Sequence, residues 1–306
     1  MTRRVAVAAM AGAGIGLSDS MPMPLFACDC HTHVFGDPAR FPYWEGRAYT
    51  PEPAGPEEML ALHKKLGIQR VVIVTPSVYG TDNSATLFGM KAYGKGARGV
   101  AVVPEKLAAL EVDALHAAGI RGIRLNLATA GITDIEAARK KLTNAMEQLR
   151  GRSWHIQIFT TPNVIAGIQD IVMKAPMPIV FDHFAGADAA KGVGQKGFRE
   201  VLQLVKSGKA YVKISGAYRA SRNAPEYADA RPFAKMLVEA NPSRILWGTD
   251  WPHPDSAPPK GGKPTDVSPL LKVDDTGLLR QLENWVPDYE IRRRILVVNP
   301  ARLYEF

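Results

Sequence analysis

The chain has 306 residues, of which 46% are hydrophobic and 22% are charged, a balance typical of a soluble globular protein. No stretch approaches the roughly 20 apolar residues of a membrane-spanning helix, so we expect no membrane partner. The net charge of +8 does not predict nucleic-acid binding, because its densest basic run, 292–294, is typical of a solvated helix face. Cys28 and Cys30 lie two residues apart on one predicted strand, where their side chains are poorly placed for a mutual disulfide, which excludes a disulfide-framed module.

Residues 1–24 form an N-terminal extension that does not belong to the predicted fold. Arg3 and Arg4 precede a short apolar, glycine-rich stretch, which resembles an export signal, but no Ala-x-Ala cleavage site follows it. We interpret the extension as a disordered segment or as the result of a start codon placed too far upstream. We therefore expect a cytoplasmic protein, with export to the periplasm as the alternative.

The remainder, 25–306, alternates between short apolar segments and segments of helical periodicity. Strands are predicted at 25–31, 69–75, 98–103, 121–126, 154–159, 178–183, 210–215 and 243–248. Helices are predicted at 57–66, 106–118, 133–150, 163–174, 197–206 and 226–240, and near residues 276 and 289. Eight such units predict an α/β fold, a single-domain (β/α)8 TIM barrel. A doubly wound open sheet is disfavoured, because no Gly-x-Gly-x-x-Gly follows the first strand.

In a barrel of this kind the functional site lies at the carboxyl ends of the strands. The polar side chains predicted at that end are His31, His33, Ser77, Thr81, Arg124, Asn126, Gln157, Asp182, His183, Ser215, Arg219, Asp250 and His253. Three histidines and an aspartate at one end of a barrel are difficult to explain as packing. The sequence therefore predicts a catalytic centre there.

Alternate side chains of a strand share a face, so Asp29, His31 and His33 are predicted to point the same way. His31, His33, His183 and Asp250 offer three nitrogens and one oxygen, a set that suits one divalent metal ion, with Zn²⁺ as the expected ion. Asp250 would serve as a ligand, as the base that activates water, or as both. The alternative is a metal-free hydrogen-bonded cluster in which Asp250 alone activates water.

Two arginines indicate an anionic small-molecule substrate. Arg124 and Arg219 follow barrel strands, and a guanidinium near the mouth of a barrel suits a carboxylate or a sulfonate. A salt bridge from Arg124 to Asp182 is the alternative. His253 is interpreted as a gating or supporting residue or as an ordinary loop histidine, whereas His63, inside a predicted helix, is expected to face solvent.

Several segments together resemble the amidohydrolase superfamily, in particular the amidohydrolase-2 group that includes the 2-pyrone-4,6-dicarboxylate lactonases and the sulfomuconolactone hydrolases. They are Asp29-Cys-His-Thr-His-Val-Phe-Gly36, Gly80-Thr-Asp-Asn83, Gly122-Ile-Arg-Leu-Asn126, Asp182-His183, Trp247-Gly-Thr-Asp-Trp-Pro-His-Pro254 and Asn299-Pro-Ala-Arg-Leu-Tyr304. These segments run from near residue 25 to the C-terminus, so the resemblance covers nearly the whole predicted barrel.

The resemblance implies a hydrolase that opens an acidic lactone during the breakdown of an aromatic compound, with Asp250 as the base. It implies that the histidines polarise the carbonyl and that Tyr49, Ser77, Thr81, Arg124 and Arg219 bind the acidic groups. The segments 127–130 and 184–187 lack the basic residues of the pyrone dicarboxylate enzymes, which favours a muconolactone carrying a sulfonate or a carboxylate. The alternative functions are an aldarolactone isomerase, the pyrone lactonase itself and a non-oxidative decarboxylase. The sequence is also compatible with a homo-oligomer.

Overall fold

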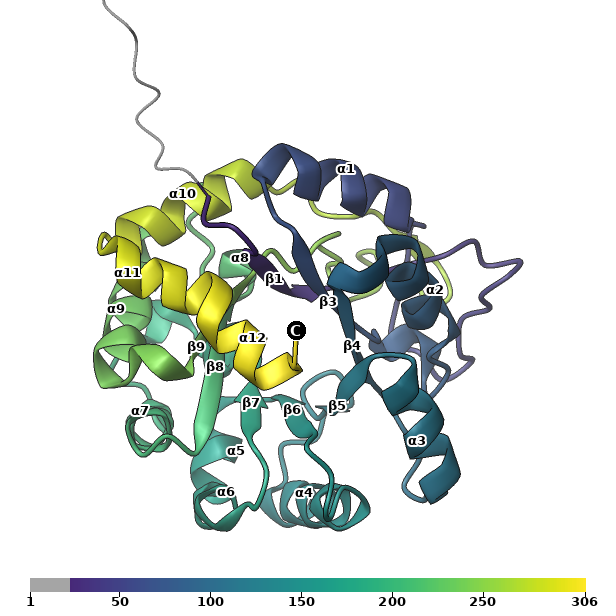
Figure 1. The fold of residues 1–306 in the computed structure, drawn as a ribbon, viewed down its shortest axis with the longest axis horizontal. Coiled ribbons are helices and arrows are strands. Elements are labelled where there is room, and N and C mark those ends of the chain that lie inside the picture. Colours follow the sequence, from purple (N-terminus) through teal and green to yellow (C-terminus); the bar gives the residue numbers. More distant parts are fainter. Residues whose placement is uncertain (1–22) are drawn as a thin grey trace, which may run out of the picture.

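The structure is a computed structural model, and it describes residues 23–306 of the chain. Eight parallel strands form one sheet in the order β1-β3-β4-β5-β6-β7-β8-β9 (Figure 1). The strands are β1 Cys28–Thr32, β3 Arg70–Val74, β4 Ala97–Ala101, β5 Ile120–Asn126, β6 His155–Phe159, β7 Ile179–Phe181, β8 Ala210–Ser215 and β9 Ile245–Gly248. The sheet closes on itself where the Asp250 N–H donates to the His31 carbonyl (2.9 Å) and the His33 N–H donates to the Trp251 carbonyl (2.8 Å). The predicted (β/α)8 barrel is therefore confirmed.

The helices lie around the barrel. They are α1 Pro56–Leu66, α2 Ser84–Tyr93, α3 Ala109–Ala117, α4 Ile135–Gln148, α5 Pro162–Gly167, α6 Gln169–Lys174, α7 Phe198–Lys206, α8 Ala217–Ala220, α9 Arg231–Ala240, α10 Asp275–Trp285, α11 Tyr289–Arg293 and α12 Asn299–Tyr304. Shorter 3₁₀ turns are η1 Ser77–Tyr79, η2 Gly94–Gly96, η3 His183–Gly186, η4 Ala189–Lys191, η5 Ala228–Ala230 and η6 Pro242–Arg244, and η7 Arg294–Val298 is a π-helical turn. No helix among residues 23–306 is both long enough and apolar enough to cross a membrane.

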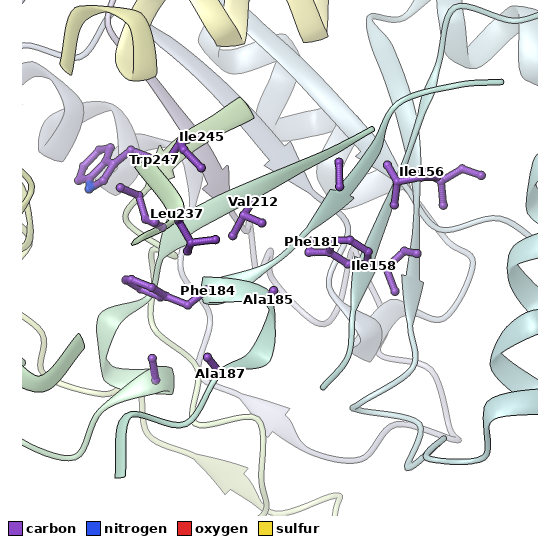
Figure 2. Close-up of a cluster of buried hydrophobic side chains, with 14 of the residues drawn as sticks. Ile156, Ile158, Phe181, Phe184, Ala185, Ala187, Val212, Leu237, Ile245 and Trp247 are labelled. Carbon is purple, nitrogen blue, oxygen red and sulfur yellow. The ribbon is translucent and has the colours of Figure 1, made fainter. Parts of the chain in front are cut away.

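Alternation along each strand separates two buried layers. Val72, Val180 and Leu246 belong to a cluster inside the barrel, together with Cys28 and Cys30. Their strand neighbours point outward to the helices, and Figure 2 shows such residues on β6 to β9, among them Ile156, Ile158, Phe181, Val212, Ile245 and Trp247. A strand buried on both faces needs apolar residues at nearly every position, which explains why the strands were predictable from composition.

Different segments cover the two ends of the barrel. Helix α12 lies across the end where the strands begin (Figure 1). Its Tyr304 packs among the interior residues. At the other end, β2 Thr50–Pro51 pairs with β10 Val267–Ser268, which joins the loop after β1 to the loop after β9. The carboxyl end is thus framed by loops, as expected for a barrel that carries its site there.

The predicted elements differ from the structure in a few places. Helix α2 was not predicted, and the helix predicted at 163–174 is two helices that meet at Ile168. The strand predicted at 178–183 ends at Phe181, so Asp182 and His183 lie on the turn that follows β7. The proposed export signal and nearly all of the extension lie outside the described residues.

Candidate active site

An irregularity in β1 brings His31 to the inside of the barrel. Asp29 pairs with Val71, but Thr32 pairs with Ile73, so β1 contains one more residue than its partner over this interval. Such a bulge reverses the alternation of side chains. The prediction that Asp29 shares a face with His31 and His33 is therefore wrong.

Asp29 instead points toward helix α1. Its Oδ2 lies 3.2 Å from Nε2 of His63, and its Oδ1 accepts the backbone N–H groups of His31 and Thr249 at 3.1 Å. The expectation that His63 faces solvent is also wrong, since this side chain is buried. Asp29 and His63 thus hold the ends of β1 and β9 together behind the site.

Two site residues sit on left-handed turns. Asp250 follows β9 with φ 67°, and His183 follows β7 with φ 49°. Non-glycine residues rarely adopt such backbone angles, and where they do, the surrounding contacts must stabilise them. Gly216, with φ 55°, follows β8 and lets both side chains approach, because a Cβ atom there would lie 3.0 Å from Asp250 Oδ2 and 3.1 Å from His183 Nδ1.

Three imidazoles converge on one oxygen of Asp250. Its Oδ1 lies 3.6 Å from His31 Nε2, 3.5 Å from His33 Nε2 and 3.9 Å from His183 Nε2. All four side chains are buried. The structure therefore brings together the four residues that the sequence predicted as one centre.

The donor atoms of this centre fit a metal ion. Ligand atoms bound tetrahedrally at 2.0–2.2 Å stand roughly 3.4 Å apart, close to the separations around Asp250 Oδ1. Asp250 Oδ1 and His31 Nε2 have no hydrogen-bond partner among residues 23–306, although both are buried. His33 Nδ1 lies 2.7 Å from the Val74 carbonyl, which can only accept, so the free lone pair of His33 is on Nε2. His31, His33 and Asp250 can thus hold one divalent ion, with His183 beside them.

Buried polar side chains inside the barrel contact His31 on its Nδ1 side. Nδ1 of His31 lies 3.2 Å from both Lys213 Nζ and Asp182 Oδ1. Lys213 also donates to Gln157 Oε1 at 2.7 Å and lies 3.6 Å from Asp182. Arg124 Nε donates to Asp182 Oδ2 at 3.0 Å, and Nη2 of the same guanidinium also lies 3.0 Å from this oxygen. The salt bridge considered as the alternative for Arg124 is therefore present.

Asp250 is held through its second oxygen. The Tyr218 hydroxyl donates to Oδ2 at 2.6 Å, and Arg219 Nε donates to the same atom. Arg219 also reaches Ser256 Oγ at 3.2 Å and the Pro254 carbonyl at 3.1 Å. The guanidinium of Arg219, which was predicted to bind the substrate, is thus hydrogen-bonded to Asp250 and fixes the orientation of this carboxylate.

Sequence reasoning did not identify Lys213 or Tyr218. A signal was available for Lys213, because it is two residues from Ser215 on one strand and so has the same inward direction. No comparable signal existed for Tyr218, which lies on the short helix α8.

Burial and neighbouring charges set the protonation of the centre. Burial lowers the pKa of His31 well below 6.5, with Lys213 as the next cause, and it lowers the pKa of His33 and that of His183, the latter to about 4. Burial alone would raise the pKa of Asp250, but Arg219 and the histidines hold it well below 3.8. At neutral pH the centre therefore has neutral imidazoles around an ionised carboxylate.

Two hollows flank this centre. One, of about 520 Å³, is lined by His183, Tyr218 and Arg219. The other, of about 970 Å³, is lined by Ser77, Thr81 and Arg124, three of the residues predicted to bind the substrate. Tyr49 and His253 are both buried.

His253 and Tyr49 both stand beside the group that holds Asp250. His253 lies edge-on to the Tyr218 ring, with centroids 5.5 Å apart, and its Nε2 is 3.1 Å from Asp275 Oδ1. This contact favours the supporting role among those considered for His253. Burial raises the pKa of Tyr49, and the charge of Arg219 opposes that rise, which places the phenol near Arg219.

We expect Gly216→Ala to reduce turnover about tenfold to a hundredfold, because the new methyl group would displace Asp250 and His183 by a fraction of an ångström. Gly151→Ala is the matched control: its φ of 76° is also positive, but nothing lies within 4 Å of the added Cβ. Steady-state kinetics and thermal unfolding of both variants test this prediction. Equal losses of activity in the two variants would assign the effect to backbone strain and not to the site.

The free energy of unfolding is expected to fall as the pH drops from 6.5 toward 4. Burial lowers the pKa of His183 to about 4 and that of His155 to about 3, whereas an unfolded histidine titrates near 6.5. In this window the unfolded chain binds protons that the folded chain does not, so acid favours unfolding. Asp182 and Asp250 also have lowered pKa values, but their contribution is lost only as the pH falls below about 3.8.

Urea unfolding with chelator, at several pH values between 7.5 and 4.5, measures this loss. His155 lies at the far end of the barrel interior, and His155→Leu should make the dependence less steep by removing one depressed histidine. A wild-type stability that is constant from pH 7 to pH 5 would contradict the expectation.

Comparisons with known proteins identify the family of this chain. The model of the Amidohydrolase family matches residues 28–306. A 4-sulfomuconolactone hydrolase from Rhizobium radiobacter is 35% identical over 285 residues, which cover 91% of this chain and 89% of the relative. A 2-pyrone-4,6-dicarboxylate hydrolase from Comamonas testosteroni is 33% identical over 287 residues, which cover 91% of this chain and 90% of the relative.

A solved structure also matches this chain. The crystal structure of a Pseudomonas putida protein described as a 2-pyrone-4,6-dicarboxylic acid hydrolase has a TM-score of 0.77 and 28% identity, and the match covers 92% of this chain and 98% of that one. The resemblance predicted from the sequence is thereby confirmed, and the chain belongs to the amidohydrolase family.

Proposed function

We propose that this protein is a hydrolase that opens the ring of an acidic lactone in the breakdown of an aromatic compound. The observation that carries the proposal is the arrangement of Asp250, whose Oδ1 has no hydrogen-bond partner among residues 23–306 and faces three imidazoles, whereas its Oδ2 is held by Tyr218 and Arg219. An oriented, ionised carboxylate with one free oxygen is suited to take a proton from water. The names of the two lactone hydrolases above, each at least 33% identical, support the same reaction.

Each step of the reaction has a residue to perform it. Asp250 Oδ1 accepts a proton from water while the water oxygen attacks the lactone carbonyl. The bond from the carbonyl carbon to the ring oxygen then breaks, and the enolate-like oxygen that leaves takes the proton held by Asp250. Tyr218 and Arg219 keep the carboxylate in place throughout, because both bind the oxygen that does not react.

We propose that His31, His33, His183 and Asp250 hold one divalent ion, with Zn²⁺ as the expected ion. When bound, such an ion would polarise the carbonyl and lower the pKa of water to about 7. The low histidine pKa values favour this proposal, since only a neutral imidazole has a lone pair to offer.

The substrate-binding residues are proposed from their places around the centre. Ser77, Thr81 and Arg124 line the larger hollow, and Arg219 lines the smaller one. Tyr49, near Arg219, and His253, beside Tyr218, would close the site from the loop side. Both arginines already contact carboxylates, so we expect them to orient the centre as well as the substrate.

A lactone panel assayed by proton release tests the proposed reaction. It should include carboxy- and sulfo-muconolactone, pyrone dicarboxylate and galactarolactone. We expect turnover of a muconolactone that carries a sulfonate or a carboxylate. Carbon dioxide release would indicate decarboxylation instead, and a product that is still a lactone would indicate isomerisation.

Zinc binding can be tested without an activity assay. Chelated protein titrated with Zn²⁺ should gain thermal stability, by about 2.7 kcal/mol when the free ion reaches 100 times its dissociation constant. His33→Ala should lose most of this gain. An unchanged melting temperature in wild-type protein, together with less than about 0.1 equivalent of metal after purification, would remove zinc from the proposal.

A further inference from the structure

The hollow of about 520 Å³ beside His183 contains two cations that the proposed mechanism does not use, Arg222 and Lys272. We propose that Arg222 and Lys272 bind the anionic substituent of the substrate, a sulfonate or a carboxylate, while the lactone carbonyl lies at Asp250. This inference rests on the proposed function and extends it by naming the residues that select for charge. Its location follows from the lining, because His183, Tyr218 and Arg219 connect this hollow directly to the catalytic carboxylate.

The distribution of charge distinguishes these two cations from the arginines nearer the centre. Arg124 is paired with Asp182, and Arg219 is paired with Asp250. Arg222 and Lys272, in contrast, are exposed and form no ion pair and no side-chain hydrogen bond within residues 23–306. Asp255 is the one acidic residue in the lining of this hollow. An anion that enters there meets two uncompensated positive charges against one negative charge.

The backbones that carry the two cations are braced. Ser221 and Asn223, on either side of Arg222, both donate to the carboxylate of Asp229. Next to Lys272, the Leu271 N–H donates to the His253 carbonyl at 2.9 Å. Anchored flanks reduce the entropy lost when a charged side chain settles on a ligand.

The remaining wall of this hollow suits the ring of such a substrate. Phe159, Tyr227, Leu271 and Val273 contribute apolar surface to it. An apolar wall with a few polar groups at defined places is typical of small-molecule sites, and a volume of 520 Å³ lies within their usual range of about 300–1,000 Å³. The hollow therefore has room for a small ring and charge for its substituent.

The larger hollow offers no comparable excess of positive charge. Three cations line it, Arg47, Arg124 and Lys141, together with the acidic Glu45 and Asp82. Two of these cations are already paired, Arg124 with Asp182 and Lys141 with Glu105 at 3.5 Å. Its charges are therefore nearly balanced. This contrast favours the smaller hollow as the place of the anionic group.

The test compares Arg222→Gln, Lys272→Gln and the double variant with Lys263→Gln, which removes an exposed lysine that lines neither hollow. For sulfomuconolactone we expect KM to rise about threefold in each single variant and about tenfold in the double variant, with kcat nearly unchanged. The methyl ester of unsubstituted muconolactone should show no such rise. Asp255→Asn should lower KM for the sulfonated lactone. All of these differences should shrink at high salt.

A binding measurement separates this proposal from the proposed reaction. Calorimetric dissociation constants for 4-hydroxybenzenesulfonate and for the neutral 4-hydroxybenzenesulfonamide should differ in wild-type protein and in Lys263→Gln, but not in the double variant. That pattern would support the anion site even if wild-type protein opened no lactone. If the double variant bound the sulfonate as tightly as wild type, or lost affinity equally for both probes, the proposal would be overturned.

Discussion

Asp250→Asn is expected to reduce lactone hydrolysis about a thousandfold, because the amide cannot accept the proton of the attacking water. The change keeps the size of the side chain, and the amide oxygen can still accept from Tyr218 and Arg219. The fold should therefore persist, with near-normal circular dichroism and a modest shift in melting temperature. Affinity for a ring-opened product should change far less than kcat.

The control for this prediction is Asp275→Asn. Asp275 contacts His253 beside the site but does not reach the three imidazoles around Asp250. We expect Asp275→Asn to retain at least about a tenth of the activity, since it acts only through His253 and Tyr218. Near-normal turnover by Asp250→Asn, with the protein folded, would show that another group is the base.

The barrel was predictable because its strands are apolar on both faces and its helices repeat every 3.6 residues. Those are local patterns, and the eight segments from 25–31 to 243–248 coincide with the eight barrel strands to within a few residues. The bulge in β1 was not predictable in the same way, because it depends on how β1 pairs with β3. Regular alternation of side chains along 28–33 therefore placed Asp29 on the same face as His31 and His33, which is wrong.

The convergence of His31, His33, His183 and Asp250 was predictable because these residues lie at or just after the carboxyl ends of barrel strands. The pairing of charges was predicted only in part, since the salt bridge from Arg124 to Asp182 was considered as an alternative and that from Arg219 to Asp250 was not. Both arginines were predicted to bind substrate, but their carboxylate partners follow other strands, 58 and 31 residues away along the chain. The sequence identifies the charged residues and the end of the barrel at which they lie. Which of them form ion pairs is decided by the closed fold.

The same reasoning explains why Arg222 and Lys272 were missed. Neither lies on a strand, and Lys272 follows a long loop that reaches the site only because Leu271 bonds to His253 and Leu270 bridges to Pro254. No periodic pattern marks such a position.

The largest loss of stability is expected from Asp182→Asn. This carboxylate is fully buried and is the common partner of Arg124 and Lys213, which are themselves buried. Its pKa is held well below 3.8 by His31, Arg124 and Lys213 against the opposing effect of burial, so it is charged in the folded protein. Replacing it with a neutral amide leaves two buried cations without a counter-charge, which should lower the free energy of unfolding by about 3–5 kcal/mol. Urea unfolding at pH 7 measures the loss.

The double variant Asp182→Asn/Lys213→Met shows whether the loss comes from charge. Removing Lys213 together with Asp182 takes away one of the two uncompensated cations, so the double variant should be more stable than Asp182→Asn by about 1–3 kcal/mol. Lys213→Met alone should cost less than Asp182→Asn, because Arg124 still neutralises the carboxylate. If the double variant were as unstable as the sum of the two single changes, the loss would come from broken packing or hydrogen bonds. The position of His31, which contacts both Asp182 and Lys213, would then not depend on the balance of their charges.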